Sequence, residues 1–137
     1  MEKNHIEAGW VSLILRIAVA SLFATAAISK FTGGLEGVVV NFQNTFKDTW
    51  LPVVLVRWYA HLIPFIEVMI PVWLLSGFRL RAAWIFTEFV LISLAFGMTV
   101  AGHYDIAASN LFYVTMACLG LYVSRFDPCR IGSGCKK

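Results

Sequence analysis

Residues 53–76 read VVLVRWYAHLIPFIEVMIPVWLLS, a run in which only Arg57 and Glu67 carry a full charge. At about 1.5 Å of rise per residue, a helix of this length crosses a hydrocarbon layer of roughly 30 Å. Three further runs of comparable length and composition follow the same pattern, at about residues 10–29, 82–101 and 106–123. These four runs predict four transmembrane helices.

The composition of the whole chain agrees with that prediction. Of its 137 residues, 59% are hydrophobic and 14% are charged, and the mean hydropathy is +0.75. A soluble domain is nearer half apolar and a quarter charged, so too little polar sequence remains here to cover four buried helices. We therefore predict an all-α integral membrane four-helix transmembrane bundle. It is expected to form one domain over residues 1–124, followed by a short cytoplasmic tail, residues 125–137.

The first apolar run has a second interpretation, as a cleavable signal peptide ending near Ala24-Thr25-Ala26. The acidic residues Glu2 and Glu7 before the run, and Arg16 inside it, argue against cleavage. Lys and Arg in the flanks then give the orientation. Seven lie beside the N-terminus, the second loop and the C-terminus, and three lie on the opposite side. This asymmetry predicts that both termini are cytoplasmic, and we expect the cytoplasmic (inner) membrane of a bacterium.

The long first loop contains a further helical pattern, over about residues 35–50. Its apolar residues recur at helical spacing and its polar residues occupy the remaining arc. Such a helix fits two positions, flat on the outer membrane surface or as a cap over the outer mouth of the bundle.

Three charged side chains lie at comparable depth inside the predicted spans. By helix rise, Arg16 lies about 9 Å, Glu88 about 10 Å and Glu67 about 13 Å from the same boundary. Charges at such depth pair, face the bundle interior or become neutral. We predict one buried polar cluster of Arg16, Glu67 and Glu88. It would be a static ion pair that fixes helix register, or a site that contacts a ligand or moves protons, whereas Arg16 could also reach the lipid head groups.

Prolines and a histidine accompany Glu67 in its run. Pro64 and Pro71 remove the amides that would bond the carbonyls of Ala60 and Glu67, so a kinked helix is predicted. A second polar set, Lys30, Arg57 and His61, lies toward the outer boundary. His61 and Glu67 are the candidate contacts for a quinone.

Other site chemistries find little support. No haem-attachment signature accompanies His61 or His103, so a haem is not expected, and no metal site or catalytic residue is assigned. No basic stripe suits nucleic acid. Cys129 and Cys135 are most simply two tail thiols; a thiol relay, metal capture with a partner and palmitoylation are the alternatives.

Two segments together carry a family resemblance. LRIAVASLFATAAISKFTG (15–33) has a Leu-Arg start, a middle of small and aromatic residues, and a small-x-x-Lys-Phe-x-Gly exit. With LIPFIEVMIPVWLLSGFRLRAA (62–83), it resembles the first two helices of the DoxX-like membrane proteins. Ala27 and Pro71 depart from the pattern, which usually has glycine there. The matching positions are Arg16, Phe23, Ala26, Ala27, Lys30, Gly33, Pro64, Glu67, Gly77, Arg81 and Ala82.

The resemblance implies a role beside redox enzymes, because relatives include subunits of thiosulfate:quinone oxidoreductase and of thiol-stress assemblies. On that reading the chain is a small subunit of a redox-associated, quinone-linked membrane complex, and any activity is that of an oxidoreductase subunit acting with partner proteins. The alternatives are a structural or assembly subunit and a small-solute carrier. Expected partners are the lipid bilayer and other subunits, with a homo-oligomer left open.

Overall fold

The computed structural model describes residues 2–126, with side-chain burial given from residue 7 onward. Within this range the chain is helical and has no strand. Cys129 and Cys135 lie outside the described residues. The elements are α1 (Glu2–Thr32), α2 (Leu35–Phe46), α3 (Val53–Ser76), α4 (Leu80–Val100), α5 (Tyr104–Val123) and a final 3-10 turn, η1 (Ser124–Phe126).

Four of these helices are long and apolar enough to cross a membrane. They cover Glu7–Thr32, Val53–Ser76, Leu80–Val100 and Tyr104–Phe126, each with a mean hydropathy of 1.6 or more. The predicted all-α integral membrane bundle is thereby confirmed. Large apolar side chains such as Trp58, Phe89 and Phe112 remain exposed on the outside of the bundle, as expected where lipid is the solvent.

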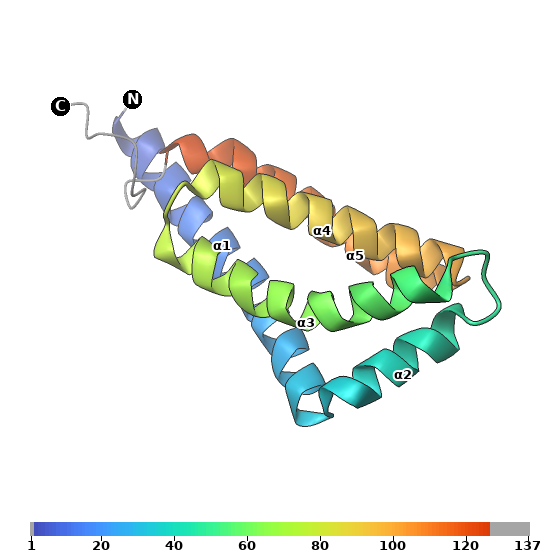
Figure 1. Ribbon diagram of the computed structural model, residues 1–137. Coiled ribbons are helices and arrows are strands. Elements are labelled where there is room, and N and C mark those ends of the chain that lie inside the picture. Colours follow the sequence, from blue (N-terminus) through green and yellow to red (C-terminus); the bar gives the residue numbers. More distant parts are fainter. Residues whose placement is uncertain (1, 127–137) are drawn as a thin grey trace.

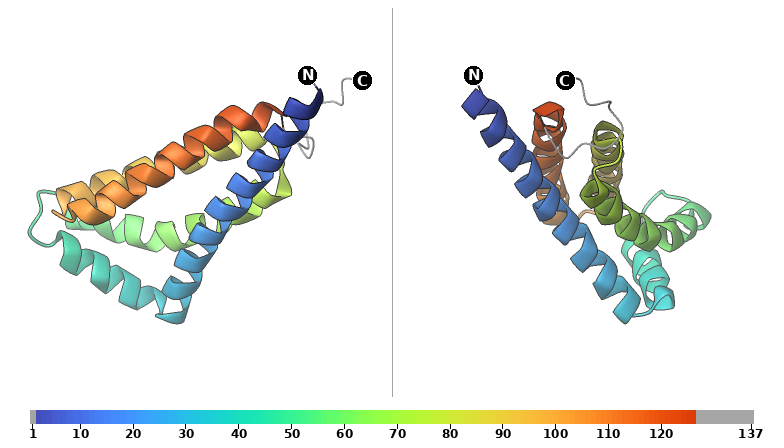
Figure 2. Two further views of the ribbon diagram at one scale, coloured as in Figure 1. Left: turned by 180° about the vertical axis from the view of Figure 1, so that it is seen from behind. Right: turned by 90° about the vertical axis from the view of Figure 1, so that its left-hand side faces the viewer.

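The helices form two closely packed pairs, α1 with α3 and α4 with α5 (Figure 1). Helix α1 also packs against α5. Both described ends of the chain lie at one end of the bundle, which we call the Glu2 end. Helix α1 runs obliquely across the others and diverges from α4 and α5 (Figure 2). Helix α2 begins where α1 ends and folds back toward the start of α3. The end of the bundle opposite the Glu2 end is called the α2 end.

Helix α3 bends along its length, as predicted from its two internal prolines (Figure 1). Pro64 and Pro71 donate no amide hydrogen bond, so the carbonyls of Ala60 and Glu67 lack their usual helical partners. The helix ends at Ser76 and is followed by Gly77, whose φ of 69° is left-handed and suits glycine. Its amide donates to the Leu74 carbonyl over 3.4 Å.

Helices α4 and α5 approach closely at one glycine. The Trp84 side chain is fully buried and lies against Gly120. A Cβ atom at Gly120 would lie 2.6 Å from the Cε2 and Cη2 atoms of the Trp84 ring, much closer than real carbon atoms approach. The absence of a side chain at this position is therefore what lets α5 pack on the indole.

Helix α2 turns its apolar stripe toward the bundle. Val38, Val39 and Phe46 are buried, and the Phe42 ring lies 6.2 Å from that of Tyr59 in α3. The Phe46 ring reaches α4, with its Cζ atom 3.4 Å from the position of a Cβ on Gly97. The stripe predicted from the sequence is thus covered, at these residues, by neighbouring helices.

Candidate functional site

A charged pair joins α1 to α3 inside the bundle. The Lys30 ammonium donates to both carboxylate oxygens of Glu67, with Nζ 2.5 Å from Oε1 and 2.6 Å from Oε2. The Glu67 side chain is only 4% exposed and that of Lys30 is 22% exposed. On α3, Glu67 lies between the fully buried Ile63 and Ile70. Two opposite charges in contact at this depth make the pair neutral, which greatly lowers the cost of burying either one.

The geometry of a helix explains how Lys30 reaches this place. Lys30 is in the last turn of α1, near the α2 end. Side chains in a helix point back toward its N-terminus, so the lysine stem runs inward along α1 and not outward to the boundary. The long stem can cover apolar surface while its ammonium reaches Glu67.

Arg16 contacts the same helix at its end. Its Nε donates to the Leu74 carbonyl over 2.8 Å and its Nη2 to the Leu75 carbonyl over 2.9 Å, and the residue is 3% exposed. Carbonyls in the last turn of a helix have no amide four residues later to bond. A cation there also faces the negative end of the helix dipole. Arg16 therefore caps the C-terminus of α3.

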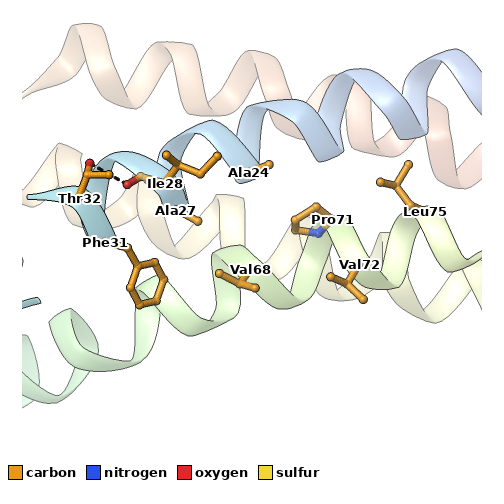
Figure 3. A pocket seen from close by; sticks show the side chains of 9 residues that line it. All are labelled: Ala24, Ala27, Ile28, Phe31, Thr32, Val68, Pro71, Val72 and Leu75. Atoms are coloured by element: carbon orange, nitrogen blue, oxygen red, sulfur yellow. Dashed lines mark hydrogen bonds between the residues drawn. The ribbon is translucent and has the colours of Figure 1, made fainter. Parts of the chain in front are cut away.

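An apolar groove runs between α1 and α3, the two helices that the charged pair joins (Figure 3). Its volume is about 530 Å³. Phe31 packs edge-on against Phe65, with ring centroids 5.9 Å apart, and among the described lining residues only Thr32 has a polar side chain. The Thr32 hydroxyl donates to the Ile28 carbonyl over 2.9 Å. The groove is lined by Ala24, Ala27, Ile28, Phe31, Thr32, Val68, Pro71, Val72 and Leu75.

Two further pockets hold the remaining candidate residues. One, of about 510 Å³, lies along an exposed face of α3 and is lined by Val54, Arg57, Trp58 and His61. The imidazole Nδ1 of His61 is 2.8 Å from the Arg57 carbonyl oxygen, which directs the ring toward the start of the helix. The other, of about 550 Å³, lies between α4 and α5 and is called the α4–α5 pocket. It is lined by Arg81, Glu88, Cys118, Leu121, Tyr122 and Arg125.

The segment of the chain that contains the charged pair matches a known protein family. The family model described as DoxX matches residues 11–103. The chain belongs to the DoxX family. The resemblance predicted from residues 15–33 and 62–83 is thereby confirmed, and the matched range includes Arg16, Lys30 and Glu67. Searches of curated proteins and of solved structures gave no match.

The DoxX structure corrects the predicted pairing of Arg16, Glu67 and Glu88. Glu67 is bound by Lys30 and not by Arg16, which binds carbonyl oxygens. Within residues 7–126 the Oε1 atom of Glu88 is buried and has no hydrogen-bond partner. Arg16 does not reach Glu67 because it contacts α3 at a different level along the helix. Leu74 is seven residues after Glu67, so Arg16 meets the same face of α3 about two turns, roughly 10 Å, further along.

The two predicted quinone contacts are also separated in this DoxX protein. Glu67 lies on the buried face of α3, whereas His61 lies on an exposed face, in a pocket that it shares with Arg57. His61 and Arg57, which are four residues apart on α3, line the same pocket. The Lys30–Glu67 pair was missed because Lys30 was assigned to the opposite boundary. One signal was available: no acidic residue lies within four positions of Lys30 in the sequence, so a carboxylate that pairs with it could come only from another segment.

The Arg16 cap gives a first prediction for the DoxX protein. Arg16→Gln should lower the free energy of unfolding by about 2 kcal/mol, because a charged donor is lost from two carbonyls at a buried helix end. Thermal unfolding in detergent, followed by circular dichroism, would measure the change. Arg57→Gln is the matched control, since Arg57 is exposed on α3. An equal loss in both variants would show that the cap contributes little.

Proposed function

We propose that this DoxX protein is a small subunit of a redox-associated membrane complex and that its α1–α3 groove receives a quinone. The observation that supports this proposal is the placement of the Lys30–Glu67 pair at the same interface as the groove. Lys30 directly precedes the lining residue Phe31, and Glu67 directly precedes Val68. An apolar groove with a few polar groups close by is the usual form of a small-molecule site.

The residues that line the groove fit an amphiphile with an aromatic-like head and an apolar tail. Ala24 and Ala27 leave room between the helices, and Phe31 offers a ring for stacking. Pro71 also lines the groove and leaves the Glu67 carbonyl without its helical donor. When bound, a quinone supplies reversible electron and proton transfer. The chain itself contributes an apolar groove and a nearby carbonyl oxygen that can accept a hydrogen bond, and partner subunits carry the reaction.

The proposal is tested by filling the groove. Ala24→Leu should reduce the quinone that co-purifies with the protein, because the larger side chain occupies the space between α1 and α3. Solvent extraction of the purified protein followed by chromatography would measure quinone per protein. Ala18→Leu is the matched control, since Ala18 is exposed on the same helix and does not line the groove. Equal quinone contents in the two variants and the wild type would contradict the proposal.

A structural or assembly subunit is the second candidate. It is favoured by the way Arg16 and Lys30 both bind α3, since these contacts fix one helix on the other. A pull-down in mild detergent separates the two functions. If Ala24→Leu keeps its partner proteins and the complex keeps its redox activity, the scaffold role is supported and the quinone role is not.

A further inference from the structure

We propose that the α4–α5 pocket binds the phosphodiester headgroup of an anionic phospholipid. The pocket lies at the Glu2 end, away from the α1–α3 groove, so the proposal is independent of the proposed quinone site. Its lining combines two arginines, a carboxylate, a thiol and an exposed tyrosine, and it has a volume of about 550 Å³.

The pocket runs from the end of the spans toward their middle. Arg81 is the second residue of α4, and Arg125 lies in η1, two residues after the last residue of α5. Both guanidinium groups therefore belong to the level at which these helices leave the membrane. Glu88 and Cys118 are each seven residues further in, which corresponds to about 10 Å of helix rise. A phospholipid is arranged in the same direction, with its charged group at the membrane boundary and its acyl chains directed inward.

The charges of the pocket favour an anion. Neither Arg81 nor Arg125 forms an ion pair with any described residue, and Glu88 forms none either. Two guanidinium groups and one carboxylate give the pocket a net charge of at least +1. One phosphodiester, with a charge of −1, would compensate it. Guanidinium groups suit this ligand because their planar donors can bind two phosphate oxygens at once.

Arg125 is already held in place for such a contact. Its Nε donates to the Tyr122 carbonyl over 3.2 Å. Its guanidinium carbon lies 4.6 Å from the centroid of the Tyr122 ring and 5.8 Å from that of Phe126. These contacts fix the arginine at the pocket rim, so less conformational freedom is lost when a ligand binds.

The surroundings favour a lipid over a soluble phosphate. Ile85 and Phe89 follow Arg81 at four-residue steps along α4 and are 40% and 68% exposed. Leu119 of α5 is 47% exposed. The arginines thus stand at the head of apolar, exposed helix faces that acyl chains can cover. A free phosphate would gain nothing from these faces.

The experiment compares lipids added to the purified protein in a neutral detergent. Phosphatidylglycerol should raise the melting temperature, while phosphatidylcholine and inorganic phosphate at equal concentration should not. Arg81→Gln and Arg125→Gln should each weaken phosphatidylglycerol binding roughly tenfold, the effect of losing one charged contact. Arg79→Gln is the matched control, because Arg79 lies two residues before Arg81, at the N-cap of α4, but does not line the pocket.

Three results would overturn the proposal. They are an equal response to phosphatidylcholine, an equal response to inorganic phosphate alone, and a phosphatidylglycerol response that both pocket variants retain in full. If a glutamine variant does not fold, binding of radiolabelled phosphatidylglycerol to the wild type decides instead. The label should then be displaced by unlabelled phosphatidylglycerol and not by phosphatidylcholine, and displacement by both would refute the site.

Discussion

Replacing Lys30 with methionine is expected to lower the free energy of unfolding by about 3–5 kcal/mol. The change leaves the carboxylate of Glu67, a side chain only 4% exposed, without the cation that it contacts. Removing one partner of a buried pair is costly because the remaining charge must stay desolvated or take up a proton. Thermal unfolding in detergent at neutral pH measures the loss as a fall in melting temperature.

Two companion variants make this result specific. The double variant Lys30→Met with Glu67→Met should recover most of the lost stability, since no charge is then left unpaired. Lys47→Met is the matched control, because Lys47 is exposed at the end of α2. If Lys30→Met costs no more than Lys47→Met, the ion pair does not hold α1 on α3.

Gly120→Ala is expected to destabilise the protein by about 1–3 kcal/mol, or to prevent folding if the helices cannot separate. The new Cβ would overlap the ring of Trp84, which is fully buried and cannot rotate away. Chemical or thermal unfolding, together with the yield of folded protein, measures the effect. This is the opposite of the usual effect of alanine in a helix, where it replaces glycine with a gain of about 1 kcal/mol.

The control for this variant is a glycine with open space around it. Gly37 lies in α2 and has no atom within 4 Å of a Cβ built on it. Gly37→Ala should therefore be neutral or slightly stabilising. Combining Gly120→Ala with Trp84→Leu should cost less than the sum of the two single changes, because the smaller side chain removes the overlap. Strict additivity would argue against a direct contact.

The transmembrane spans could be predicted because their signal is local. Each span is predicted from the length and apolar character of its own segment, without knowledge of the other helices. The bend of α3 was predictable for the same reason, since Pro64 and Pro71 act on their own helix. Burial of Arg16 and Glu67 also followed from their depth in apolar runs.

The partners of these charges could not be predicted, because pairing depends on how α1 crosses α3. Counting residues from a span's end assumes parallel helices, whereas α1 runs obliquely (Figure 2). Arg16 binds backbone carbonyls, and these cannot be predicted as partners from the positions of acidic residues in the sequence. Gly97 and Gly120 cannot be distinguished from the sequence, yet of the two only Gly120 is in close contact with an indole ring.

The two contacts of α1 with α3 have a consequence for biosynthesis. Lys30 meets a residue 37 positions later, and Arg16 meets one 58 positions later. Neither contact can form until the ribosome has made α3, although α1 emerges first. The charged groups of α1 therefore exist before the groups that they bind, and they gain these contacts only when α3 packs against α1.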